Sequence, residues 1–205
     1  RIIEKITNEE SEYKSPTDMG VNRAGFGIID DEICKAAARQ EIIRRYIIAE
    51  CDYKKGKISE EALNRSKLLM DEMGLHVEDR IVVSPARAYA EHKRNCDPRY
   101  ENVVVMALEM PDGSIVTGRS SRRMVAAAAC VLNAIKKLAN IGDDIPLISS
   151  SVLKSIQDLK TDILRQDRSS LNCEEILSAL IISSTTNPAA EMAAEKLECI
   201  RGCKA

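Results

Sequence analysis

The stretch VVVMALEMPDGSIVTGRSSRRMVAAAACVLNAIKKL, residues 103–138, decides the fold. An apolar run rich in valine ends at Pro111, Asp112 and Gly113, and a second short β-branched run follows. Proline fixes φ at the first central position of a turn and glycine accepts a positive φ, so this tripeptide predicts a tight reversal. Two short strands joined in this way predict a β-hairpin. The Ala-rich segment after it predicts a helix from about residue 121 to residue 140.

The other segments predict mostly helix. Ser59 and Asn172 precede acidic first turns, and Asn187 precedes a proline, which are typical helix starts. The predicted helices span about residues 30–53, 59–74, 78–95, 149–164, 172–184 and 187–199. This pattern predicts an α+β protein, predominantly helical, with a small β-sheet containing the hairpin. We expect a helical region with an N-terminal loop at 1–95 and an α+β region with the hairpin and four helices at 96–205.

A lone hairpin is marginally stable in water, so further elements must cover it. We expect additional strands from outside this sequence or from just past Ala205, or association with other copies through the open sheet edges. The sequence begins at Arg1 without methionine, and residues 2–6 are typical of the end of a helix. We therefore expect a fragment of a longer protein that forms a homo-oligomer.

Composition excludes several classes of function. The net charge is −2, aromatic residues make up 3% of the chain and tryptophan is absent. These values give no basis for binding nucleic acid or an anionic membrane surface. No apolar run approaches the roughly 20 residues of a spanning helix, and we expect no signal peptide. We expect a cytoplasmic protein with no membrane and no nucleic-acid partner.

The seven cysteines are scattered and form no C-x-x-C pair. An odd number without short spacings argues against a disulfide framework, so we expect seven free thiols in a reducing compartment. Cys199 and Cys203 could share a helix face, but no histidine is close to them in sequence. We therefore expect no metal site and no cofactor within this chain.

The corner that follows the hairpin is the strongest candidate site. It combines backbone amides, hydroxyl groups and arginines near a predicted helix start, an arrangement that suits phosphate or carboxylate. The alternative is that Ser120 or Ser121 only caps the helix while the arginines are solvated. The candidate anion-binding residues are Thr117, Gly118, Arg119, Ser120, Ser121 and Arg122.

A long loop at residues 8–27 is the second candidate, because long ordered loops often have a function. Its polar side chains could contact a substrate, and Asp18 could act as a general base or bind a divalent metal. The alternative is an ordered loop whose Asp and Thr side chains bond to their own backbone. The candidate substrate-loop residues are Lys14, Ser15, Thr17, Asp18 and Asn22.

Five segments together resemble the C-terminal half of a family of uncharacterised bacterial proteins, a domain of unknown function. They are YKSPTDMGVN at 13–22, IDDE at 29–32, RQEIIRRY at 39–46, LEMPDGSIVTG at 108–118 and TNPAAE at 186–191. The resemblance implies a longer protein with a Rossmann-like N-terminal half that contains a phosphate-loop-like segment, and a β-rich segment after residue 205. Some members are labelled ATP-dependent peptidases, but this sequence shows no peptidase motif. The family has a lysine where this chain has Arg119, which keeps the positive charge.

Two functional hypotheses follow. In the first, this is the C-terminal region of a cytoplasmic enzyme of unknown reaction, and its own N-terminal half, absent here, binds a nucleotide or other phosphate ligand. The loop and the corner would then line a shared cleft. In the second, the chain is a structural or oligomerisation module without catalytic residues of its own.

Overall fold

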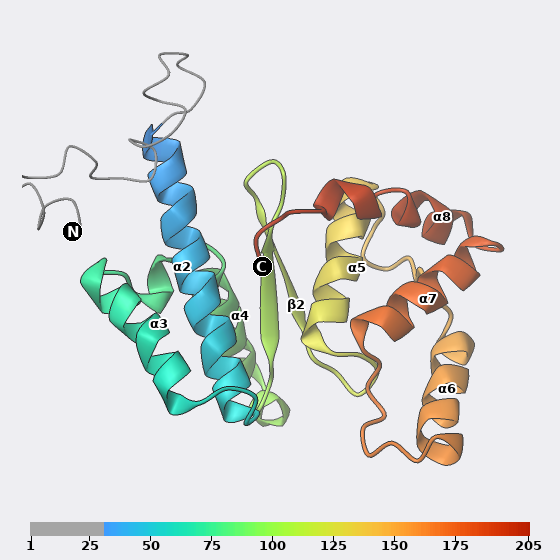
Figure 1. Cartoon of the computed structure of the whole chain (residues 1–205). Helices are drawn as coiled ribbons and strands as arrows, with labels where there is room; N and C mark the ends of the chain where they lie inside the picture. The colour runs from blue at the N-terminus through green and yellow to red at the C-terminus, as the bar shows by residue number, and fades with distance from the viewer. Residues whose placement is uncertain (1–30) are drawn as a thin grey trace, which may run out of the picture. The chain divides into compact units, whose positions relative to one another are not determined.

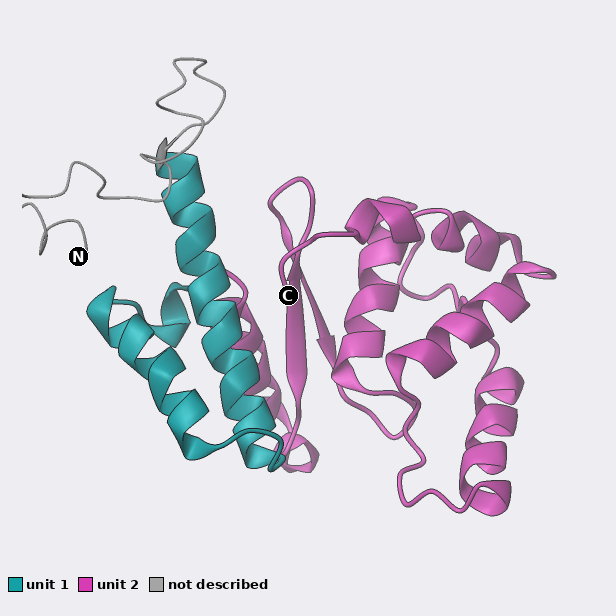
Figure 2. Ribbon diagram, viewed as in Figure 1, with its two compact units in different colours: residues 1–80 teal, residues 81–205 magenta. Residues whose placement is uncertain are grey.

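The structure, a computed structural model, describes residues 31–205. The substrate loop with Lys14, Ser15, Thr17, Asp18 and Asn22 lies outside the described residues. The chain divides into two compact units, Arg1–Arg80 and Ile81–Ala205 (Figure 2). The helix that follows the division belongs with the hairpin in the second unit.

The first unit contains a pair of helices, α2 (Asp31–Lys54) and α3 (Glu60–Glu72), followed by the short 3-10 helix η3 (Val77–Asp79). The Ser59 hydroxyl accepts a hydrogen bond of 3.3 Å from the Ala62 amide, which confirms the predicted cap. Gly74 has a φ of 60° and follows the end of α3, as glycine commonly does. The core of this unit consists of Ile43, Met70 and Leu75 with partly buried neighbours.

The second unit combines the hairpin with helices, which confirms the α+β class (Figure 1). Before and within the hairpin lie α4 (Val83–Cys96), η4 (Pro98–Tyr100), β1 (Val105–Glu109) and β2 (Ile115–Arg119). After it follow α5 (Ala126–Leu138), α6 (Ser150–Asp158), the π-helix η5 (Leu159–Ile163), α7 (Cys173–Ser184), α8 (Pro188–Ala194) and the 3-10 helix η6 (Leu197–Ile200). The caps predicted at Asn172 and Asn187 are confirmed, since each side chain accepts a hydrogen bond from its helix start.

The hairpin forms as predicted. β1 and β2 are antiparallel, and their register runs from Val105 opposite Arg119 to Glu109 opposite Ile115. At the turn, the Gly113 amide donates to the Met110 carbonyl at 2.9 Å with φ of 78° at the glycine. This is the positive φ for which glycine is suited.

Helices cover both faces of the hairpin. α4 packs against both strands, and Figure 1 shows α4 and α5 on opposite sides of them. On the α5 side, Leu108, Met110 and Val116 form a buried cluster with Cys130 and Ala134. The hairpin is therefore buried between two helices, which explains why apolar residues occur on both faces of β1.

Gly118 allows α5 to approach β2 at backbone distance. A Cβ atom at this position would lie 2.1 Å from the Cys130 nitrogen, 2.4 Å from the Cys130 Cα and 2.7 Å from the Ala129 carbonyl carbon. All three are main-chain atoms of α5, so no side-chain rotation could relieve the overlap. Only glycine is compatible with this packing.

The other side of α5 forms the larger core of the unit. Ala128 and Ile135 pack there against residues of α6, α7 and α8. The fully buried members include Leu171, Ile176, Ala179, Leu180, Ala190 and Ala193. α5 is thus the element shared by the hairpin cluster and the helical cluster.

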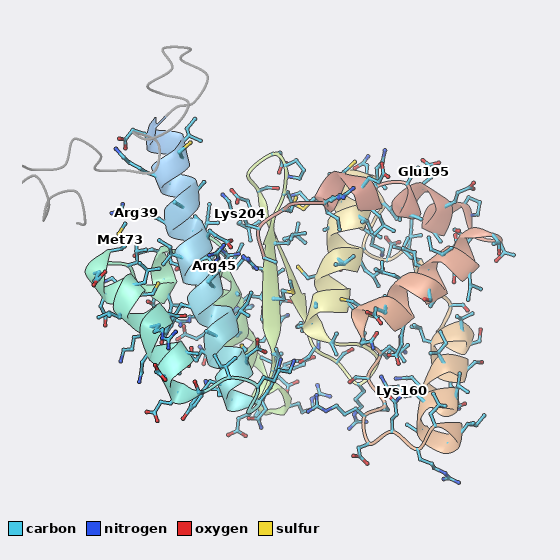
Figure 3. The ribbon with its side chains drawn as sticks, in the orientation of Figure 1. Arg39, Arg45, Met73, Lys160, Glu195 and Lys204 are labelled. Atoms are coloured by element: carbon cyan, nitrogen blue, oxygen red, sulfur yellow. The ribbon has the colours of Figure 1, made fainter. Side chains whose placement is uncertain are left out.

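The outer edge of β1 contacts the end of the chain. The Glu109 amide donates to the Lys204 carbonyl at 2.8 Å, and the Lys204 ammonium lies 3.1 Å from the Glu109 carboxylate (Figure 3). Among residues 31–205 the sheet contains two strands. The further strands expected from the sequence stay a prediction.

The prediction that the Ala-rich helix begins near residue 121 is wrong, because α5 begins at Ala126. Residues 121–125 do not join the helix, because their backbone groups form other hydrogen bonds. The Ser121 hydroxyl accepts hydrogen bonds of 3.2 Å from the Arg123 and Met124 amides, which closes a turn. The Val125 amide donates to the Leu171 carbonyl at 2.9 Å, so tertiary pairing overrides helix propensity here.

Three other helix predictions need correction. The helix expected at 187–199 is α-helical only over α8, which ends at Ala194, and the 3-10 helix η6 follows it. The helix expected at 78–95 begins only at Val83, with Val82 as its N-cap, and Pro85 lies at its third position, where its missing amide hydrogen is still harmless. The helix expected at 149–164 is α-helical only to Asp158 and continues as the π-helix η5. Lys160, a buried residue, lies in η5.

We predict that Gly118→Ala destabilises the second unit by about 3 kcal/mol or more, because overpacking against backbone cannot relax locally. Chemical denaturation followed by circular dichroism measures the change. The control is Gly142→Ala, where the new Cβ meets only the Asp144 carboxylate, at 2.7 Å, which can rotate away. Equal stability of the two variants would contradict the packing described here.

Candidate functional site

The first half of the predicted corner forms the end of the hairpin. Thr117, Gly118 and Arg119 lie on β2, and the Thr117 carbonyl accepts a 2.9 Å hydrogen bond from the Asn133 side chain. The Ser120 hydroxyl accepts from the Val104 amide at 3.0 Å, and the Ser120 amide donates to the Val104 carbonyl at 2.8 Å. These groups extend the pairing between the strands.

Arg119 has an aromatic neighbour. Its guanidinium lies 4.7 Å from the centre of the Tyr100 ring. Such a contact holds a cation in place without neutralising it. The Arg119 side chain is therefore already engaged by Tyr100 of η4.

Neither serine caps α5. The N-cap is Val125, whose side chain makes no capping hydrogen bond, and Ser121 instead closes the turn before it. The alternative interpretation of the corner as a serine-capped helix start is therefore wrong. Of the candidate residues, Arg122 is the one whose side chain is exposed and has no interaction with the described part of the chain.

Pairing between distant segments places a second arginine-containing loop beside Arg122. The Leu171 amide donates to the Arg123 carbonyl at 2.9 Å, and the Leu171 carbonyl accepts a hydrogen bond of 2.9 Å from the Val125 amide. The Gln157 side chain donates to the Arg122 carbonyl at 2.9 Å and to the Ser169 carbonyl at 3.2 Å. One side-chain nitrogen thus fixes both loops.

Several exposed arginines lie on these two loops, and we name the three that are nearest in sequence to the paired residues, Arg122, Arg123 and Arg168, the arginine corner. None of them forms an ion pair within the described residues 31–205. Asp167 is adjacent in sequence and also exposed. Arg123 belongs to the corner that the sequence already indicates, whereas no local signal points to Arg168, because its place beside the turn depends on the pairing of Leu171.

A buried ion pair supports the second loop. Lys160 is 7% exposed, and its ammonium donates to the Glu175 carboxylate at 2.8 Å and to the Ser170 carbonyl at 3.0 Å (Figure 3). The same oxygen of Glu175 accepts the Asn172 amide at 2.7 Å and completes a capping box at the start of α7. Lys160 on η5 therefore holds the loop at 164–172 and the start of α7 through its hydrogen bonds.

The surroundings of Glu175 favour its charged form. Burial raises the pKa of the carboxyl, but the hydrogen bonds from Lys160 and the Asn172 amide outweigh burial and lower the pKa below its ordinary value of 4.5. The ion pair thus persists at neutral pH. This is the expected behaviour of a partly buried carboxylate with strong donors.

All seven cysteines are free thiols, as predicted. Burial raises the pKa of Cys130 to about 11, and its thiol lies 3.5 Å from the Val116 carbonyl. Cys130 thus behaves as a small apolar residue. Within residues 31–205 no group of three or more His, Cys, Asp or Glu side chains could hold a metal ion.

A surface groove of about 470 Å³ lies in the first unit between α2 and α3. Its two arginines are already paired, Arg45 with Glu41 at 2.9 Å and Arg65 with Glu61 at 2.7 Å. Hydrogen bonds from Arg44 and Arg45 lower the pKa of Glu41 to about 2. Since both arginines of the groove are paired with carboxylates, the groove has fewer unpaired positive charges for binding an anion than the arginine corner has.

Comparison with known proteins identifies the family. Residues 78–205 match the domain of unknown function DUF1846, C-terminal, and residues 1–74 match the domain of unknown function DUF1846, N-terminal. The chain therefore belongs to the DUF1846 family. The boundary between the two matches lies close to the division between the compact units.

Similar proteins occur in Clostridium botulinum. The chain is 55% identical over all 205 residues to the UPF0371 proteins of strains Kyoto and Alaska E43, and 54% identical to that of strain Langeland. It spans 41% of the length of each of these relatives. In residues 31–205 no helix has both the length and the apolar character needed to cross a bilayer.

We predict that Glu175→Gln lowers the free energy of unfolding by about 3 kcal/mol, because it leaves the Lys160 ammonium buried without its counter-charge. The stabilisation in the native protein is present above pH 4.5 and is lost as the pH falls through the lowered pKa of Glu175. Denaturation curves at pH 7 and pH 3 measure both effects.

The matched control is Glu174→Gln, since Glu174 is exposed one residue away in the same helical turn. It removes the same charge from the same helix start, at a cost of about 0.3–1 kcal/mol. Equal losses in the two variants would show that the helix dipole, and not the ion pair, explains the effect.

Proposed function

We propose that the second unit binds a phosphate-bearing ligand at the arginine corner, Arg122, Arg123 and Arg168. The observation that supports this is that three exposed arginines, none of them ion-paired within the described residues, lie on two loops held together by backbone hydrogen bonds and by the Gln157 side chain. Like charges repel when they are placed together, so an arrangement of this kind is favoured when an anion is shared between them.

Arginine suits this role chemically. The guanidinium is planar, stays charged at physiological pH and presents paired donors that match two oxygens of a phosphate. The loops are held by the Gln157 bridge and by the Lys160 pair, so little ordering is needed on binding. The Ser120 and Ser121 hydroxyls serve in structural hydrogen bonds, and the proposal rests on the arginines alone.

In the longer protein we propose a cytoplasmic enzyme to which this chain contributes its C-terminal region. A Rossmann-like N-terminal half would bind a nucleotide, and the loop with Lys14, Ser15, Thr17, Asp18 and Asn22 would face the same ligand, with Asp18 as candidate base. The support is the resemblance of the loop motif and the length of the relatives, of which this chain covers 41%.

Thermal unfolding in the presence of inorganic phosphate tests the proposal. We expect the melting temperature to rise with phosphate and to saturate, as mass action requires. The double variant Arg122→Ala, Arg168→Ala should bind phosphate about 10-fold more weakly or worse, since a charge-assisted hydrogen bond contributes about 1.5–3 kcal/mol.

Arg201→Ala is the control, because Arg201 is an exposed arginine at the end of η6. It should leave the phosphate response unchanged. Sodium chloride at equal ionic strength controls for screening. A rise that never saturates, or that survives the double variant, would exclude a phosphate site at the arginine corner.

An oligomerisation module is the second candidate function. Ile181 and Ile182 on α7 are 51% and 62% exposed, although α7 buries its other face in the core. Exposed apolar side chains of this kind are typical of interaction surfaces. Light scattering of the chain and of an Ile181→Ser, Ile182→Ser variant is the test; an oligomer that the variant converts to monomer would favour this function, and a monomeric parent chain would reject it.

A further inference from the structure

The last turn of α4 presents a thiol and an imidazole side by side. His92 and Cys96 are four residues apart, so they share a face of the helix, and both are exposed. The Cys96 sulfur lies 3.7 Å from His92 Nε2 and 4.0 Å from Nδ1. The exposed Cys51 and Cys199 have no histidine close in sequence, which makes this pair distinctive among the exposed thiols.

The separation matches two ligands of one tetrahedral zinc ion. A thiolate at about 2.3 Å and an imidazole nitrogen at about 2.1 Å, at a tetrahedral angle, bring the two ligand atoms to about 3.6 Å from each other. Because the sulfur lies almost equally far from both ring nitrogens, the exposed His92 imidazole must rotate to direct Nε2 at a metal shared with Cys96. Both residue types are preferred zinc ligands.

The neighbouring charges leave this face open to a cation. Lys93 is directed at the Tyr89 ring at 5.3 Å, and the Arg94 guanidinium donates to the Glu101 carbonyl. Cys96 is the last residue of α4, where the helix carbonyls favour positive charge. Since no third metal-binding side chain gathers with the pair in residues 31–205, water would complete the coordination.

We propose that His92 and Cys96 form a binding site for Zn²⁺ at the end of α4. Binding replaces the thiol proton with a sulfur–zinc bond and releases that proton to solvent, while the neutral imidazole donates its electron pair to the metal. The site is independent of the arginine corner. It belongs to the class of two-residue helical chelates and exchanges its metal readily, because solvent reaches it directly.

Titration of the 205-residue chain with Co²⁺ tests the site, because a cobalt–thiolate bond absorbs in the near ultraviolet and reports the sulfur ligand. We expect a saturable band that excess Zn²⁺ removes. Cys96→Ser and His92→Gln should each abolish the saturable band, whereas Cys199→Ser, at another exposed cysteine of the same unit, should retain it. Circular dichroism of the variants should match the parent chain, because both side chains are exposed.

The absence of a band in the parent chain would overturn the proposal. A band that persists in Cys96→Ser would assign the metal to another thiol. A band lost in Cys96→Ser but retained in His92→Gln would reduce the site to a single thiolate and would overturn the chelate.

Discussion

The close approach of β2 and α5 at Gly118 is the constraint on which the second unit depends. Because no side chain separates the strand from the helix there, α5 can bury one face on the hairpin and its other side on α6, α7 and α8. The same approach fixes where β2 ends and α5 begins. The intervening residues must then form a turn, and that turn contains Arg122 and Arg123.

The arginine corner is thus a consequence of packing more than of local sequence. Leu171 is fully buried and pairs through its backbone with Arg123 and Val125, which brings the loop with Arg168 next to the turn. The buried Lys160 anchors this loop by its bond to the Ser170 carbonyl.

Local signals in the sequence were sufficient to predict most helices and the hairpin. The turn at Gly113 and the caps at Ser59, Asn172 and Asn187 depend on contacts within a few residues, and the predicted hairpin and helix starts were confirmed. The start of α5 was not predictable, because the partner of Val125 is Leu171, 46 positions away in the printed sequence. Arg168 was missed for the same reason. By contrast, the His92 and Cys96 spacing was visible in the sequence, although only the structure shows that the two side chains face each other at 3.7 Å.

Native-state hydrogen exchange of backbone amides tests the central claim most directly, namely that the hairpin and α5 form one cooperative unit. If the Gly118 approach unites them, the slowest amides of β2 and of residues 130–138 should exchange with the same free energy of opening and the same dependence on denaturant. Exchange of the hairpin amides at a much lower free energy than those of α5 would show that the hairpin opens independently, and it would contradict this account.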